Sequence, residues 1–358
     1  MLIANYAAAV GVLALVIFVH ELGHFLVAKW CGVEVLTFSI GFGPTLVSRT
    51  WGETEYRVAL VPLGGYVRMA GQDDSEDLRP SDPSRGFSAK KLWQRAAVVA
   101  AGPGVNFLFA FVVFAGVAGY FGQVVPSDAP RVRALLDGAP AQAAGIRAGD
   151  TVVSIDGTAV SHWDQLYEAV RSSEGRTLSV VVLSDTGEQR TVALTPEQRD
   201  DRDYLGEVIG KRYVIGIERD FDHQRLGAVA AVAAGGRTTW RWTATIFETL
   251  WRLFQGRISP RDLGGPIMIA QEASHRAKTG MEPLLMFLAL ISVNLGVINV
   301  LPIPVLDGGH LFFFLVEGLR GRPISLRYRE YAQQVGVFLI VALMVFVVFN
   351  DLNRIVSG

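Results

Sequence analysis

The stretch Phe18-Val-His-Glu-Leu-Gly-His-Phe25 places two histidines and a glutamate within an apolar part of this 358-residue chain. No charged residue occurs over residues 2–19, and apolar residues resume at Phe25. A transmembrane helix needs about 20 mostly apolar residues, and the segment lacks the basic start of a signal peptide. We therefore expect residues 1–30 to form a retained transmembrane helix that carries a polar cluster.

The histidines of this cluster have the spacing of a metal site. His20 and His24 lie four residues apart, so both imidazoles project from one face of a helix and can bind the same ion. With Glu21 they form the HExxH pattern of zinc peptidases, in which the glutamate accepts a proton from the attacking water. Cys31 is the only cysteine, which excludes a multi-thiolate site. The pattern predicts Zn²⁺ as the cofactor and Glu21 as the catalytic base.

Composition points to a membrane protein. Half of the residues are apolar, and three further stretches without charged residues are long enough to cross a bilayer, at 96–127, 283–306 and 331–350. These stretches make the lipid bilayer an expected partner. The net charge of −1 gives no overall attraction to nucleic acid or to anionic surfaces, so no nucleic-acid partner is expected. We expect an α-helical polytopic membrane protein with four transmembrane helices.

The basic residues predict the orientation in the membrane. Lysines and arginines are frequent between the first and second apolar stretches, and four arginines follow the third at positions 320, 322, 327 and 329. Short loops rich in such residues stay in the cytoplasm. Both termini and the long segment between the second and third stretches are then expected on the outer side.

The first half of that outer segment has the pattern of a small α+β domain. Strand-like runs occur at 132–136, 150–155 and 178–183, with turns at Asp156-Gly157 and at 185–187, and residues 163–172 have a helical pattern. The run Gly138-Ala-Pro-Ala-Gln-Ala-Ala-Gly-Ile146 and its continuation to Gly157 resemble the signature of a PDZ domain. The resemblance implies capture of a peptide ligand by strand addition. A purely structural spacer of the same fold is the alternative.

A different composition follows this domain. Residues 226–255 combine apolar residues with three tryptophans and three arginines, which favours a helix lying at the membrane interface over a fifth span. The expected order is therefore a first transmembrane helix (1–30), a cytoplasmic loop with a membrane-associated hairpin (31–92), a second transmembrane helix (93–122), an extracytoplasmic PDZ domain (123–200), an extracytoplasmic segment with the interfacial helix (201–283), a third transmembrane region (284–316), a cytoplasmic loop (317–332) and a fourth transmembrane helix with its tail (333–358).

A third metal ligand is expected from outside the first helix, because catalytic zinc usually has three protein ligands and an open position. Asp307 follows the third apolar stretch, at a depth comparable with that of His20. Pro302 and Pro304 interrupt the helix just before it, and irregular backbone at membrane depth is tolerated where it lines a cavity. His310 is a possible fourth ligand, but it would close the position that water needs.

These motifs together resemble the site-2 protease family of intramembrane metalloproteases, and its bacterial branch fits best. The resemblance rests on HELGH at 20–24, on Asn299, Pro302 and Leu306-Asp307-Gly308, and on further segments at 41–44, 64–69, 101–106 and 263–267. It implies that His20, His24 and Asp307 are the zinc ligands and that Asn299 holds the substrate backbone. Enterobacterial members carry two tandem PDZ domains, whereas this chain is expected to have one.

The hairpin is expected within residues 56–69, with its turn at Leu63-Gly64-Gly65. The resemblance implies that it dips toward the membrane and that Gly64, Gly65 and Tyr66 bind the substrate as an edge strand. Strand addition is physically reasonable because a helical substrate must unwind before water can reach its peptide bonds. A hairpin with only a structural role is the alternative.

The resulting hypothesis is a zinc metalloprotease of the bacterial inner membrane. Its expected partners are single-span membrane proteins, either anti-sigma factors or remnant signal peptides, whose transmembrane segments it cleaves. The alternative is a membrane-bound PDZ adaptor with a structural or vestigial metal site. Two histidines, an aspartate and an adjacent glutamate favour the enzyme, because they leave the metal an open position.

Overall fold

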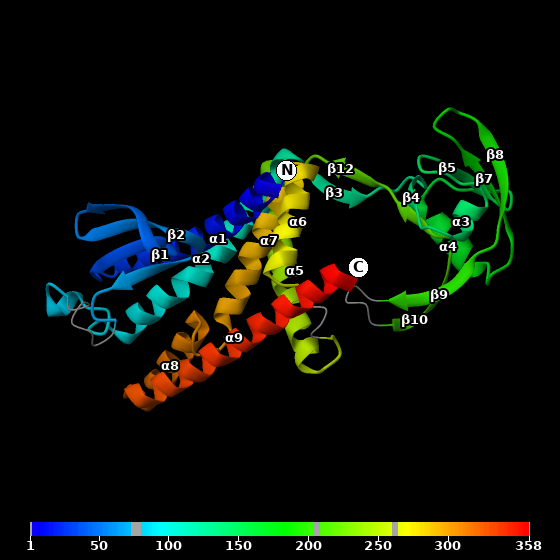
Figure 1. Ribbon diagram of the computed structural model, residues 1–358. Coiled ribbons are helices and arrows are strands. Elements are labelled where there is room, and N and C mark those ends of the chain that lie inside the picture. Colours follow the sequence, from blue (N-terminus) through cyan, green and yellow to red (C-terminus); the bar gives the residue numbers. More distant parts are fainter. Residues whose placement is uncertain (1, 73–79, 203–207, 260–263, 358) are drawn as a thin grey trace. The chain divides into compact units, whose positions relative to one another are not determined.

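The computed structural model describes residues 2–72, 80–202, 208–259 and 264–357 of the chain (Figure 1). The chain forms two compact units. The first contains Met1–Tyr120 and Gly227–Gly358, and the second contains Phe121–Leu226. The second unit is thus inserted into the first, as expected for a domain placed between two transmembrane helices.

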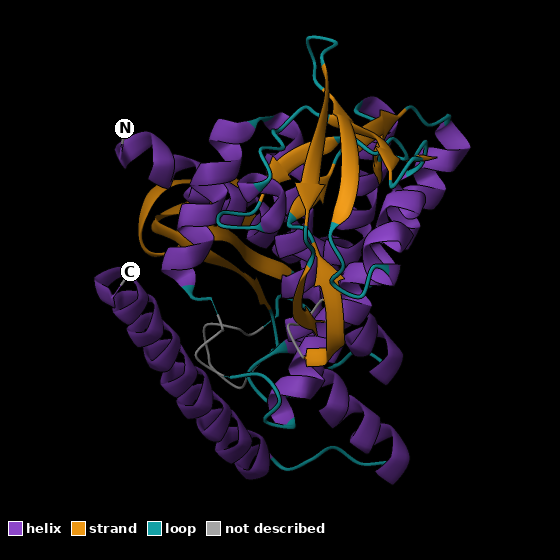
Figure 2. Cartoon of the chain, turned by 90° about the vertical axis from the view of Figure 1, so that its right-hand side faces the viewer, coloured by secondary structure: helices purple, strands orange, loops and turns teal. Residues whose placement is uncertain are grey.

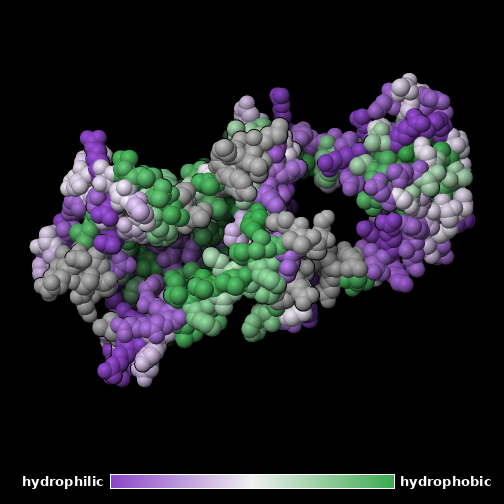
Figure 3. All heavy atoms as spheres, in the orientation of Figure 1, coloured by the Kyte–Doolittle hydropathy of each residue, from purple (hydrophilic) through white to green (hydrophobic). Residues whose placement is uncertain are grey.

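Four helices in the described part of the chain are long and apolar enough to cross a membrane. They belong to the first unit and are α1 (Leu2–Trp30), α2 (Leu92–Tyr120), α7 (Met281–Val300) and α9 (Leu326–Ser357). The prediction of four helices of spanning length is confirmed. Apolar residues, green in Figure 3, gather along the visible face of this helical unit.

The centre of the first unit is the packing of α1, α2 and α7. Val16 of α1 lies in a buried cluster with Phe287 and Leu288 of α7, while Ala110 and Phe114 of α2 pack with α7 in a second cluster. Two shorter helices complete the bundle: α6 (Pro266–Thr279) contacts α1 and α7, and α8 (Asp307–Arg320) contacts α2. The three central helices therefore hold one another by apolar side chains.

The helix expected at 226–255 is present as α5 (Ala228–Phe254). It lies lengthwise along α2, because Ala231 is near Gly119 and Gly235 packs against Ala115. A Cβ atom at Gly235 would lie only 2.7 Å from that of Ala115, so the missing side chain allows the two helices to approach closely. Its placement at a membrane interface stays a prediction.

Helix α9 is less buried by the rest of the chain than the other three candidate spans, and Figure 2 shows it at the edge of the helical unit. Polar contacts hold it near both ends. Arg329 lies 3.5 Å from Glu317 of α8, which also pairs with Arg95 of α2. Toward the other end, the carboxylate of Asp351 accepts hydrogen bonds from backbone N–H groups at the start of α6.

Two long antiparallel strands, β1 (Val35–Trp51) and β2 (Thr54–Met69), pack against α1. The chain turns from β1 into β2 at Gly52, whose φ is +65°. It reverses again within β2, between Val58 and Gly65, because residues 55–58 run parallel to residues 37–40 of β1 whereas residues 65–69 run antiparallel to them. The predicted reversal near Leu63-Gly64-Gly65 is therefore present, but the predicted pairing of its two sides is wrong. Both strands are bent. Phe38 consequently pairs with Tyr56 on one side and with Val67 on the other, so the two halves of β2 flank β1 instead of pairing with each other.

The second unit contains a four-stranded antiparallel sheet of order β6-β5-β7-β8, formed by β5 (Thr151–Ile155), β6 (Thr158–Ala159), β7 (Leu178–Leu183) and β8 (Gln189–Leu194). Leu166 of helix α4 (Trp163–Ser172) packs into its core with Val152 and Val180. The predicted helix 163–172, the strands at 132–136, 150–155 and 178–183, and the Asp156-Gly157 turn are confirmed.

This unit extends beyond the expected limit at residue 200. Later strands return to pair with earlier ones. β12 (Phe221–Gln224) pairs with β3 (Gln123–Pro126), β11 (Ile217–Arg219) pairs with β4 (Val132–Leu135), and β10 (Val208–Val214) pairs with β9 (Glu197–Arg202). The short helix α3 (Pro140–Ala143) completes it. The last strands therefore bring the chain back beside the first strand of the unit.

Candidate metal centre

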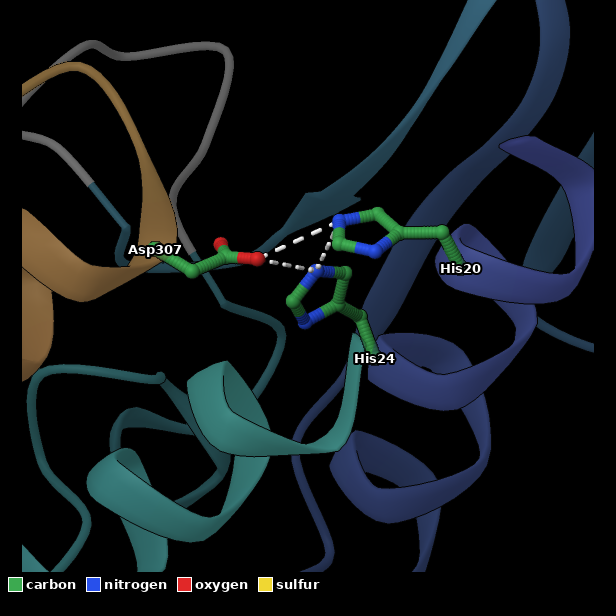
Figure 4. A group of neighbouring side chains, drawn as sticks. All are labelled: His20, His24 and Asp307. Carbon is green, nitrogen blue, oxygen red and sulfur yellow. Dashed lines mark hydrogen bonds and ion pairs between the residues drawn. The ribbon is translucent and has the colours of Figure 1, made fainter. Parts of the chain in front are cut away.

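Three side chains from two distant parts of the sequence converge inside the first unit (Figure 4). Nε2 of His20 and Nε2 of His24, both on α1, are 3.2 Å apart. Oδ2 of Asp307, at the start of α8, lies 3.2 Å from Nε2 of His20 and 3.4 Å from Nε2 of His24. The three atoms form a nearly equilateral triangle. The closeness of the two imidazole nitrogens is expected from the four-residue spacing of the histidines.

Helix α2 fixes the ring of His24. Nδ1 of His24 lies 2.9 Å from the backbone carbonyl oxygen of Val98, which can only accept a hydrogen bond. The proton of the neutral imidazole is therefore on Nδ1, and Nε2 has a lone pair directed at Asp307. This is the tautomer that a metal ligand needs.

The position of Asp307 follows from the break between α7 and α8. Helix α7 ends at Val300, and the proline-containing segment that follows returns the chain to α8. A Cβ atom at Gly308 would overlap the carbonyl oxygens of Val300 and Leu301, so only glycine allows this tight return. The predicted helix break before Asp307 is confirmed.

The triangle has the dimensions of a zinc site. Tetrahedral coordination with Zn–N and Zn–O bonds of 2.0–2.1 Å separates the ligand atoms by about 3.3–3.4 Å. The observed separations are 3.2, 3.2 and 3.4 Å. Oδ2 of Asp307 is also buried without a hydrogen-bond partner, and a bound cation would satisfy it. The three residues therefore fit a zinc ion.

A cavity of about 610 Å³ opens onto these side chains. Of the residues predicted to form the site, it is lined by His20, Glu21, His24, Gly65, Tyr66, Asn299 and Asp307. Gly65 lies directly against the side chain of Glu21, whereas Gly64 faces the ring of Phe42 and is not part of the lining. His310 lines the cavity but is outside the group of three converging ligand atoms. The segment before Asp307 thus borders a cavity, as expected for irregular backbone at membrane depth.

Comparison with known proteins identifies the family. The sequence pattern of peptidase family M50 matches residues 8–343, which is nearly the whole chain. The chain belongs to peptidase family M50. This agrees with the site-2 protease resemblance seen in the sequence.

Relatives of this M50 peptidase carry names that agree with the site. A protein of Agrobacterium fabrum named "Putative zinc metalloprotease" is 35% identical, with 97% of this chain and 95% of the relative covered. One of the same name from Mesorhizobium japonicum is 40% identical, with 95% and 96% covered. The regulator of sigma-E protease RseP of Salmonella typhimurium is 31% identical, with 98% and 99% covered. The chain is accordingly a zinc metalloprotease.

The RseP alignment also shows a difference in length between the two proteins. It runs over 449 positions and covers nearly all of both proteins, although this M50 peptidase has only 358 residues. The relative therefore contains a substantial number of residues without a counterpart here.

Helix α2 contributes residues to the metal centre that the sequence did not assign to it. Val98, Gly102 and Asn106 follow one another at intervals of four, so they lie on one face of the helix. Val98 accepts the hydrogen bond from His24, Gly102 packs against both imidazoles, and Asn106 contacts Nδ1 of His20. Their spacing within an apolar helix was the available signal. A sequence cannot show that His24 bonds to the carbonyl oxygen of Val98, or that both imidazoles use the space beside Gly102.

Proposed function

We propose that His20, His24 and Asp307 hold the zinc ion of this protease and that Glu21 is its general base. The observation that carries this is the triangle of ligand atoms at the spacing of tetrahedral zinc, with Glu21 in the same cavity. Zinc bound there makes water nucleophilic at neutral pH and polarises a carbonyl group. Glu21 takes the proton of the attacking water and delivers it to the leaving amide nitrogen.

The proposed substrate is a peptide bond within a transmembrane segment of a single-span protein, of the anti-sigma factor or remnant signal peptide type. The ligands and Glu21 belong to helices of spanning length or follow one directly, so a substrate must be presented at membrane depth. Such a segment has its carbonyl groups in helical hydrogen bonds and must be extended before attack.

The extended substrate is held by the sheet and by Asn299. Gly65 and Tyr66 lie in β2 beside Glu21 and line the cavity, where a substrate strand paired with β2 would pass Glu21. Asn299 is buried at the end of α7 and also lines the cavity, where its amide can bind a substrate backbone group. Gly64 has an indirect role, because it lets β2 pack on Phe42.

The proposed location is the bacterial inner membrane, with both termini and the second unit on the periplasmic side and the metal centre toward the cytoplasm. The distribution of basic residues supports this. In a Cys31→Ser background, cysteine at Thr186 should react with an impermeant maleimide added to spheroplasts, whereas cysteine at Arg322 should react only after lysis. The reverse pattern would contradict the orientation.

The second unit is proposed to be a PDZ domain that binds a peptide ligand. Two observations support this: the strand order of its four-stranded sheet, and the packing of helix α4 into the same core. If the chain were instead a PDZ adaptor with a vestigial metal site, its function would depend on this unit and would be indifferent to Glu21.

The decisive experiment compares the intact chain with Glu21→Gln. Both are purified in detergent, their zinc content is measured, and a single-span model substrate is added. We expect one zinc per chain in both, with cleavage by the intact protein only. Glu282→Gln, at the start of α7, is the matched control and should cleave normally. Cleavage by Glu21→Gln would disprove the proposed mechanism.

A further inference from the structure

The side chain of Asn106 occupies a position that no part of the proposed reaction uses. It is fully buried on α2, and its amide end built as Nδ2 lies 3.1 Å from Nδ1 of His20. Its other end, Oδ1, is buried without a hydrogen-bond partner. A buried polar atom without a partner is costly, so this amide needs an explanation.

The chemistry of His20 decides which end of the amide faces it. A neutral imidazole carries one proton, and a nitrogen that binds a metal cannot carry it. If Nδ2 donates to Nδ1, the proton of His20 is on Nε2, which points at Asp307 and at Nε2 of His24. That arrangement is incompatible with zinc bound by Nε2.

Turning the amide by 180° removes the conflict. The nitrogen and oxygen ends of a carboxamide have nearly the same shape and are assigned from their hydrogen bonds. With Oδ1 toward His20, the amide accepts the Nδ1 proton and leaves a lone pair on Nε2. The oxygen then has a partner, and the NH₂ group takes the position that Oδ1 had. His20 acquires the tautomer that the carbonyl oxygen of Val98 imposes on His24.

Neighbouring residues hold Asn106 in its position beside His20. Ser292 of α7 donates a hydrogen bond of 2.9 Å to the backbone oxygen of Asn106. This bond connects α2 to α7, the helix that also carries Asn299. Gly102 lies one turn earlier and packs against the same two imidazoles. Small changes in the packing of α2 on α7 would therefore move the group that orients His20.

We propose that Asn106 is a positioning residue of the metal centre, whose side-chain oxygen accepts the Nδ1 proton of His20 and so directs Nε2 to the zinc ion. This inference rests on the proposed function, because it requires His20 to be a zinc ligand. It predicts a change in zinc affinity, which can be measured separately from proteolysis. Loss of a residue that hydrogen-bonds to a metal ligand typically weakens metal binding by roughly 10–100-fold.

The test measures zinc affinity of the full-length protein in detergent by competition with a chromophoric chelator. Asn106→Leu keeps the size of the side chain but removes the acceptor, so its zinc dissociation constant should rise roughly 10–100-fold. Asn106→Asp offers an acceptor oxygen from either end and should stay within a few-fold of the unmodified protein. Asn294→Leu makes the same exchange on α7 at a residue that does not line the cavity, and should leave zinc affinity unchanged.

Thermal unfolding of the metal-free proteins separates positioning from folding. Asn106→Leu and Asn106→Asp should unfold within a few degrees of the unmodified protein. Unchanged zinc affinity in a folded Asn106→Leu, or an Asn106→Asp affinity weakened as much as that expected for leucine, would overturn the inference. A weakened zinc affinity of Asn106→Asp would overturn the inference even if Asn106→Leu does not fold.

A further pair of variants distinguishes failure of the proposed function. His20→Ala and Asp307→Ala should lose tight zinc binding. If they bind zinc as well as the unmodified protein, the ligand assignment itself is wrong. If they lose it while Asn106→Leu does not, only the role of Asn106 is rejected.

Discussion

Gly102 of α2 packs so closely against His24 that a methyl group at position 102 would overlap Nε2 of that imidazole. The same methyl group would lie 2.7 Å from Cε1 of His20. Both histidines are buried, so the rings cannot move aside without disturbing their neighbours. The absence of a side chain at this position thus sets the space available to two of the three proposed ligands.

Gly102→Ala should therefore weaken zinc binding and proteolysis together. We expect at least a 10-fold loss of zinc affinity, and on the order of 100-fold lower activity, because a displacement of about 1 Å in a site can have that effect. Zinc competition and cleavage of a single-span substrate would measure both. Gly104→Ala is the matched control, since a Cβ atom there meets nothing within 4 Å. Equal behaviour of the two variants would show that Gly102 does not limit the site.

Removal of the metal should inactivate the protease reversibly. The buried Oδ2 of Asp307 then loses the cation that would satisfy it, so we expect both activity and thermal stability to fall. At a free zinc concentration 100 times the dissociation constant, binding adds about 2.7 kcal/mol to the free energy of unfolding. Cleavage and melting temperature before and after chelation, and after zinc is restored, measure this.

The same titration with Asp307→Ala provides the comparison. This variant should show little or no rise in melting temperature at zinc concentrations that saturate the unmodified protein. An identical rise in both proteins would place the stabilising zinc somewhere other than at His20, His24 and Asp307.

Apolar segments made the helical part of the fold predictable. Runs of about 20 apolar residues have few alternatives to a spanning helix, and the four predicted spans all appear as helices. The pairing of the hairpin was not predictable in the same way. The chain does reverse just before Gly65, but the strands on either side pair with β1. Gly64 and Gly65 also contact Phe42 and Glu21, which are distant in sequence. A local pattern cannot show which distant contact a glycine permits.

The same reasoning separates what was predictable in the metal centre from what was not. Charged and imidazole side chains within apolar helices are conspicuous, so His20, Glu21, His24 and Asp307 could be selected from the sequence alone. Asn106 was also visible as a polar residue in a span, but its partner was not. The contribution of Val98 is a backbone oxygen, which any residue at that position would supply.

The core of the second unit should depend on Leu166. This side chain is 2% exposed and packs between α4 and the sheet. In residues 121–226 expressed alone, which form a compact unit with their own core, Leu166→Ala should lower the free energy of unfolding by roughly 2–5 kcal/mol. Urea denaturation followed by circular dichroism measures the change.

The adjacent Tyr167 is the control for that experiment. It is on the same helix but 46% exposed, so Tyr167→Ala should change the free energy of unfolding by less than about 1 kcal/mol. Similar losses in both variants would mean that Leu166 is not the buried anchor of α4. Failure of the fragment to unfold cooperatively would mean that the unit requires the rest of the chain.

Asp351 should stabilise the attachment of α9 to α6. Its Oδ1 accepts a hydrogen bond of 3.0 Å from the N–H of Gly265, and its Oδ2 accepts bonds of 3.1 and 3.2 Å from Ile267 and Met268. In Asp351→Asn, one of these oxygens becomes an NH₂ group, so at least one backbone N–H faces a donor. The negative charge at the start of α6 is lost as well. We expect a loss of roughly 1–3 kcal/mol in the free energy of unfolding.

Thermal unfolding in detergent and the rate of proteolysis of α9 measure this loss. Asp137→Asn makes the same chemical change at an exposed position of the second unit and should have no effect on either. Because α9 has little apolar packing within the chain, the Asp351 contacts should account for much of its attachment at that end. If Asp351→Asn melts and is cleaved like the unmodified protein, α9 must be held by its other contacts, such as that between Arg329 and Glu317.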